Sequence, residues 1–199
     1  MKRLLAFLAL CTAASACVQA ADPITLGLSY PRTGSYKEEG LAQMRGALLA
    51  IDEINAQGGV LGRSLRLSSL DDASKPDKAV RNVDKLAKEG AAMLFGGASS
   101  AVAIAAGKRA AQLDLLYFGT LTYSNDTTGK DGHRHMFREC NNAWMSAQVL
   151  GQYLNKQLPG KRYFYVTADY TWGHTTESSL RQTTNTQDAA QHAGLKVPF

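Results

Sequence analysis

The chain has 199 residues, of which 45% are hydrophobic, and a formal net charge of +5 at pH 7. This length is enough for one domain, or for one domain and part of another. The basic residues are scattered or occur in pairs, such as Lys108-Arg109 and Lys161-Arg162, so the charge pattern argues against nucleic-acid binding. Beyond the N-terminus, no apolar stretch reaches the roughly 20 residues that a transmembrane helix needs.

Residues 1–20 have the three-part order of a secretory signal peptide. The cationic Lys2 and Arg3 precede an apolar run at 4–10, and small residues follow as far as Ala20. We expect cleavage after Ala20 and export to the periplasm. The alternative is lipid attachment at Cys17, because the residues before it loosely resemble a lipoprotein box.

The first part of the remaining chain predicts two strands, each followed by a helix. A compact apolar strand is expected at 24–29, and periodic apolar residues predict a helix over 38–57 that ends at Gly58-Gly59. The next strand is expected at 65–70, and Pro76 fits the first turn of the helix that follows it. The apolar face of the first helix is predicted to comprise Leu41, Met44, Leu48, Ile51 and Ile54.

The same alternation continues toward the C-terminus. Further strands are predicted at 91–95, 115–118, 136–138, 163–167 and from 195 onward. Helices are predicted at 100–112, at 142–158 and from 173 to about 193. Strands that alternate with helices at this spacing pair in parallel through right-handed crossovers, so the predicted fold class is α/β and doubly wound.

Ligands of doubly wound sheets bind beyond the carboxyl ends of the strands. This rule selects four loops before any further consideration, because each of them follows a predicted strand. The four loops are 30–37, 96–100, 119–128 and 169–173.

Two segments of the chain resemble the branched-chain amino-acid (Leu/Ile/Val) binding proteins of bacterial ABC importers. They are GALLAIDEINAQGGVLGRSLRL at 46–67 and DDASKPDKAV at 71–80, within a resemblance that extends over about 24–181. The resemblance implies the type I periplasmic-binding-protein fold, in which two α/β lobes joined by a hinge enclose a ligand. Members of the family are considerably longer. We therefore expect a signal peptide at 1–20, lobe one at 21–140 and a truncated, partial lobe two at 141–199.

The function implied by the resemblance is capture of a small molecule for an importer. The expected ligand is an amino acid or a related small carboxylate or amide, and the expected partners are the ABC permease and ATPase in the inner membrane. An extracytoplasmic ligand-sensing domain of the same fold is the alternative. The ligand itself stays open, because several loop residues depart from the branched-chain pattern.

Ser99 and Ser100 stand at the start of a predicted helix, directly after a strand. Free N–H groups and the helix dipole make such a place an anion site, and serine hydroxyls can donate to a carboxylate. Ordinary N-capping by serine is the alternative. The resemblance favours ligand binding, because in the family this turn holds the carboxylate of amino-acid ligands.

Six other side chains complete the predicted site. By resemblance, the loop with Thr120 and Thr122 offers a carbonyl and a hydroxyl to the ligand ammonium, although a plain threonine-rich surface loop is the alternative. Trp172 precedes Gly173 where the family commonly has Tyr-Gly, and such an aromatic can cover the ligand and exclude water. Packing at the surface between the lobes is the alternative for Trp172. The cleft mouth is within reach of Arg32, Tyr36 and Glu39, although charged side chains there are more commonly solvated.

A metal site and an active site are the remaining alternatives. His133, His135, Cys140 and His174 are residue types that bind zinc, but their spacing fits no closed motif, and neighbouring cations would repel a metal ion. The sequence contains no glycine-rich nucleotide-binding motif and no nucleophile elbow. We therefore expect no metal, no cofactor and no enzymatic activity.

Overall fold

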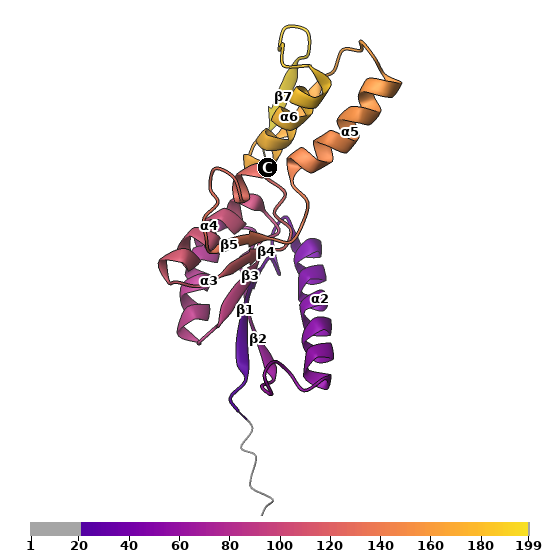
Figure 1. Ribbon diagram of the computed structural model, residues 1–199. Coiled ribbons are helices and arrows are strands. Elements are labelled where there is room, and N and C mark those ends of the chain that lie inside the picture. The colour runs from indigo at the N-terminus through magenta and orange to yellow at the C-terminus, as the bar shows by residue number, and fades with distance from the viewer. Residues whose placement is uncertain (1–20, 199) are drawn as a thin grey trace, which may run out of the picture.

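The computed structural model describes residues 21–198, so the predicted cleavage after Ala20 and the alternative lipidation of Cys17 lie outside the described residues. A five-stranded parallel sheet has the order β2-β1-β3-β4-β5, and a smaller parallel sheet pairs β6 with β7 (Figure 1). The large sheet comprises β1 (Ile24–Tyr30), β2 (Leu65–Asp71), β3 (Met93–Gly96), β4 (Tyr117–Gly119) and β5 (Met136–Arg138). The small sheet comprises β6 (Tyr165–Ala168) and β7 (Gly194–Val197).

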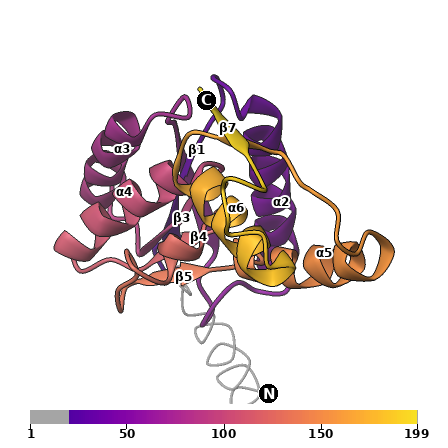
Figure 2. The same ribbon diagram turned by 90° about the horizontal axis from the view of Figure 1, so that it is seen from above.

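Helices cover both faces of the large sheet. Helix α2 (Lys37–Ala56) lies on one face, and α3 (Pro76–Lys88) and α4 (Ser100–Gln112) lie on the other (Figures 1 and 2). Helices α5 (Ala143–Gln157) and α6 (Thr171–Thr184) pack together beside the small sheet, and a short 3-10 helix, η1 (Asn125–Thr127), lies between β4 and β5. The doubly wound α/β class is therefore confirmed.

The hydrophobic core lies between the large sheet and the pair α3 and α4. Leu94 and Tyr117 project from the sheet, while Val83 and Leu86 of α3 are fully buried against them. Helix α4 contributes small side chains, because Ala103, Ala106 and Ala110 are all 0% exposed. These alanines let α4 approach the sheet closely, and the approach fixes the position of the N-terminus of α4.

The predicted apolar face of α2 was largely wrong. Of its five residues only Ile51 is buried, whereas Leu48 is 45% exposed and Ile54 36% exposed. Two helices share the opposite face of the sheet, but α2 packs alone, against β1 and β2. A single helix on a wide sheet leaves part of its apolar stripe uncovered in this chain.

The predicted end of the last helix was also wrong, because α6 ends at Thr184 and not near residue 193. Asn185 has a φ of 57° and forms a left-handed C-cap, a conformation that asparagine tolerates better than most residues. The N-terminus of α5 agrees with expectation, since the side chain of Asn142 accepts a hydrogen bond from the N–H of Met145 at 2.8 Å. None of the described helices combines the length and apolar character needed to cross a membrane.

We expect this chain to self-associate in solution. Large apolar side chains are exposed on α5, on β6 and just before β6, including Val149 at 74%, Val166 at 68% and Phe164 at 64%. Exposed apolar patches together with the unpaired edges of a two-stranded sheet favour association. Light scattering after size-exclusion chromatography should detect oligomers, and Val149→Glu with Val166→Lys should shift them toward monomer. A wild-type chain that stays monomeric at high concentration would contradict this.

Candidate functional site

Three loops meet at the carboxyl edge of the large sheet. The loop after β1 carries Tyr36, the turn after β3 carries Ser99 and Ser100, and the loop after β4 carries Ser124. Because β3 lies between β1 and β4 in the sheet, the two serines lie between the other two loops. The strand-end rule therefore selects one continuous region of the surface.

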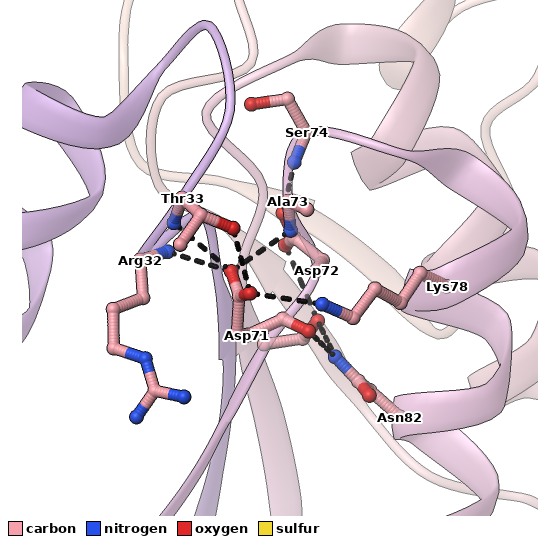
Figure 3. Close-up of polar contacts among 9 residues, drawn as sticks. Arg32, Thr33, Asp71, Asp72, Ala73, Ser74, Lys78 and Asn82 are labelled. Carbon is pink, nitrogen blue, oxygen red and sulfur yellow. Dashed lines mark hydrogen bonds and ion pairs between the residues drawn. The ribbon is translucent and has the colours of Figure 1, made fainter.

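The loop after β1 is held in place by Asp71 (Figure 3). The carboxylate of Asp71 accepts hydrogen bonds from the N–H groups of Arg32 at 2.9 Å and Thr33 at 3.1 Å, and from the Thr33 hydroxyl at 2.8 Å. It also accepts from the N–H of Ala73 and forms an ion pair with Lys78 at 2.8 Å. Partial burial opposes ionisation, but the hydrogen bonds, that of Lys78 first, lower the pKa of Asp71. A charged Asp71 therefore fixes this loop.

Asp72 lies deeper and forms a second polar cluster (Figure 3). Its carboxylate is 0% exposed and accepts hydrogen bonds from the N–H of Ser74 at 2.9 Å and the Ser29 hydroxyl at 3.3 Å. The amide of Asn82 donates to the Ser29 hydroxyl at 3.2 Å. Burial raises the pKa of Asp72 to about 6, against the effect of these hydrogen bonds. The hydroxyl of Ser74 accepts from the N–H of Tyr36 at 3.1 Å, so this segment also supports the first loop.

The two serines have different environments. Ser99 is the N-cap residue of α4 but its side chain makes no capping hydrogen bond. The hydroxyl of Ser100 is buried and accepts a hydrogen bond from the N–H of Ser124 at 3.0 Å. Ser100 therefore joins the turn after β3 to the loop after β4, whereas the hydroxyl of Ser99 is not used as a cap.

The two threonines also differ. The hydroxyl of Thr120 donates to the carbonyl of Gly96 at 3.2 Å, at the carboxyl end of β3. Thr122 is 0% exposed, and its hydroxyl shares a hydrogen bond of 2.6 Å with the hydroxyl of Thr127. Thr120 thus lies at the edge of the site, while Thr122 shapes the loop from inside in this arrangement. Direct ligand contact by either hydroxyl stays a prediction.

The first turns of α6 contact the loop after β4. The hydroxyl of Ser124 lies within hydrogen-bonding distance of the hydroxyls of Thr171 at 3.0 Å and Thr175 at 3.2 Å. The Thr171 hydroxyl donates to Asp126 at 3.0 Å, and the amide of Asn125 donates to the Ser179 hydroxyl at 2.9 Å. These short polar side chains attach α6 to the loop after β4 in lobe one.

The residue before α6 reaches the other flanking loop. The hydroxyl of Tyr170, the N-cap residue of α6, forms a hydrogen bond with the hydroxyl of Tyr36. Tyr36 thus lies in the predicted site, in contact with the second lobe. The ring of Trp172 packs at a centroid distance of 6.0 Å from that of Tyr170, and Trp172 lines a small pocket together with residues of β6 and α6. Tyr170 therefore reaches from the second lobe to the loop after β1, and Trp172 contacts its ring.

Two predicted side chains lie at the rim. The backbone of Arg32 is bound to Asp71, but its guanidinium points away from that cluster (Figure 3). Glu39 is exposed in the first turn of α2. The structure therefore brings Tyr36, Ser99, Ser100 and Thr120 to one edge, with Arg32 and Glu39 outside them.

Sequence reasoning missed the side chains that connect the lobes, namely Tyr170, Thr171, Ser124 and Asn125. Only Tyr170 carried a signal in the sequence, as an aromatic residue directly after a predicted strand.

A pocket with a volume of about 360 Å³ lies between α4, η1 and α6, but its two lysines form ion pairs with Asp126 and Asp131. Within residues 21–198 no group of three or more His, Cys, Asp or Glu side chains is placed to hold a metal ion.

Two α/β lobes that contact one another at the carboxyl edge of the large sheet define a two-lobed binding protein. The chain belongs to the periplasmic binding protein family, whose pattern it matches over residues 23–198. Its relatives include the Leu/Ile/Val-binding protein BraC3 of Rhizobium johnstonii, with 31% identity over 81% of this chain and 44% of that protein. A leucine-, isoleucine-, valine-, threonine- and alanine-binding protein of Pseudomonas aeruginosa is 27% identical over 89% of this chain and 46% of its own length. The chain spans a little under half the length of these relatives.

Solved structures show the same fold. An amino acid ABC transporter substrate-binding protein from Pseudomonas fluorescens superposes with a TM-score of 0.75 and 25% identity, covering 90% of this chain and 47% of that one. A solute-binding protein from Rhodopseudomonas palustris, in complex with 3,4-dihydroxybenzoic acid, has a TM-score of 0.76 and 22% identity over 88% of this chain and 47% of its own. The type I periplasmic-binding-protein fold is thus confirmed.

Proposed function

We propose that this protein is the extracytoplasmic solute-binding component of an ABC importer. It captures an amino acid, or a related small carboxylate or amide, between the lobes and delivers it to the permease and ATPase. The observation that supports this most is the position of the N-terminus of α6. It contacts the loop after β1 through Tyr170 and the loop after β4 through Thr171, and so spans the Ser99 turn that lies between them.

The chemistry of this enclosed region suits a carboxylate. Helices α4 and α6 both begin here, and neither N-cap side chain satisfies the first N–H groups of its helix. Such N–H groups and the positive ends of the two helix dipoles attract an anion. Thr120 donates its hydroxyl proton to Gly96, so its oxygen lone pairs remain able to accept from an ammonium group. An α-amino acid carries both groups.

The names of the relatives support the same ligand class. The named relatives bind leucine, isoleucine and valine, and one solved relative contains isoleucine while another contains a dihydroxybenzoic acid. A carboxylate is common to all these ligands. Within the described residues the site supplies helix termini and hydroxyls, and we propose that it binds a ligand without catalysis. Export by the segment 1–20 belongs to the same proposal.

The first test is calorimetry of the protein with the standard amino acids and with benzoate. We expect at least one carboxylate ligand to bind, and Ser99→Ala and Ser100→Ala each to weaken binding by about 1–3 kcal/mol, because each removes a hydroxyl beside the bound anion or the loop that encloses it. Ser178→Ala, an exposed serine elsewhere on α6, should bind like the wild type. Folded serine variants with unchanged affinity would contradict the carboxylate site.

The alternative role is that of an extracytoplasmic sensor. A transport role predicts that reconstituted permease and ATPase take up the ligand only when the loaded protein is present. A sensor predicts no dependence of uptake on this protein. Uptake assays in proteoliposomes therefore separate the two roles once a ligand is known.

A further inference from the structure

We propose that Tyr36 and Tyr170 form a latch that holds the two lobes closed and sets how long a ligand stays bound. This inference rests on the proposed function for its ligand, but the latch itself is a property of the ligand-free protein. The two hydroxyls come from residues 134 positions apart, one on each lobe, and they bond directly to one another. This side-chain hydrogen bond joins the loop after β1 to the second lobe.

Tyr36 and Tyr170 are each held in place by contacts within their own lobe. The loop with Tyr36 is fixed by three hydrogen bonds from Arg32 and Thr33 to Asp71 and by the bond from the Tyr36 N–H to Ser74. Tyr170 is the N-cap residue of α6, its carbonyl accepts from the N–H of His174 at 3.0 Å, and its ring contacts that of Trp172. Two rigidly supported phenols lose little additional side-chain entropy when they bond.

The position of the tyrosine pair allows it to control how the second lobe closes on the first. The contacts of Thr171, Thr175 and Ser179 attach α6 to the loop after β4, on one side of the Ser99 turn. The contact between Tyr36 and Tyr170 lies on the other side, at the loop after β1. If the attachment at β4 stays intact, breaking the tyrosine contact frees one side of the cleft and lets the second lobe swing away from Ser99.

The latch stays uncharged across the physiological range. Burial raises the pKa of the Tyr36 hydroxyl, and burial together with the bond to Tyr36 raises the pKa of the Tyr170 hydroxyl. Two neutral hydroxyls form a bond of moderate strength, which closes the cleft without making release impossible. A stronger ion pair at this place would hinder delivery of the ligand.

The test uses Tyr36→Phe, Tyr170→Phe and the double variant, which remove only the hydroxyls. Spin labels at Ala50→Cys on α2 and Gln152→Cys on α5, with Cys140→Ser, report the distance between the lobes by pulsed electron paramagnetic resonance. Without ligand, we expect each single variant to show a longer and broader distance distribution than the wild type. The double variant should resemble the singles, because either change alone breaks the same bond.

Tyr153→Phe is the matched control, because Tyr153 is 61% exposed on α5. Its distance distribution should equal that of the wild type, and all variants should keep the wild-type circular dichroism. A second readout uses L-leucine as the probe, with stopped-flow dissociation rates expected to rise about three- to tenfold when the hydroxyl bond is lost. Unchanged interlobe distances in the folded single variants would overturn the latch. Absence of amino-acid binding by the wild type, with lengthened distances in the variants, would overturn the proposed ligand and leave the latch supported.

Discussion

Gly96→Ala is expected to lower the free energy of unfolding by about 3 kcal/mol, because it combines backbone strain with a collision between strands. Gly96 ends β3 with a φ of +135°, a conformation that side chains rarely adopt. A Cβ atom there would lie 1.9 Å from the carbonyl oxygen of Ser29 on the neighbouring strand. Relief requires β1 and β3 to separate at the edge where the Ser99 turn begins, so ligand binding should weaken as well.

Gly46→Ala is the matched control for this prediction. Gly46 lies within α2, and nothing lies within 4 Å of the position that a Cβ atom would take. Alanine costs less conformational entropy than glycine in a helix, so this change should raise stability by about 0.5–1 kcal/mol. Urea unfolding followed by circular dichroism measures both variants. A Gly96→Ala midpoint equal to that of the wild type would show that the edge of the sheet adapts without cost.

Much of the fold was predictable because its signals are local. Pro76 at the start of α3 and Gly58-Gly59 after α2 act within one turn of the chain, and each marks a boundary that the structure confirms. The end of α6 was missed because Asn185 ends the helix by adopting a left-handed conformation, which asparagine does only in some contexts. The exposure of Leu48 was missed because periodicity identifies an apolar face but does not say what covers it.

The candidate site was predictable only in part. The rule for strand ends placed Ser99 and Ser100 correctly at the carboxyl edge, because the topology of a doubly wound sheet fixes where its loops gather. The contact between Tyr36 and Tyr170 depends on how two lobes meet, and residues so distant in sequence leave no shared pattern. The burial of Thr122 depends on its bond to Thr127, which spacing alone does not reveal.

The second large effect concerns Asp72 and the pH dependence of stability. Burial raises its pKa from 3.8 in the unfolded chain to about 6 in the fold. The folded state therefore binds the proton more tightly, and stability is lost as pH rises from about 4 to about 6. A shift of this size corresponds to about 3 kcal/mol at neutral pH. The pKa of Asp71 is lowered, so that residue acts in the opposite direction and mainly below pH 4.

Asp72→Asn should remove this dependence, because an amide carries no charge to bury. Its oxygen can accept from the N–H of Ser74, and its NH₂ group can donate to the Ser29 hydroxyl. We expect the variant to match the wild type near pH 4 and to exceed its stability by up to about 3 kcal/mol at pH 7.

The measurement is urea unfolding of both proteins at intervals from pH 4 to pH 7. The difference between the two curves cancels the contribution of His133, whose pKa is lowered by burial. A difference that stays constant with pH would mean that Asp72 ionises as freely in the fold as in the unfolded chain, and that its cluster with Ser29 and Asn82 fully compensates the buried charge.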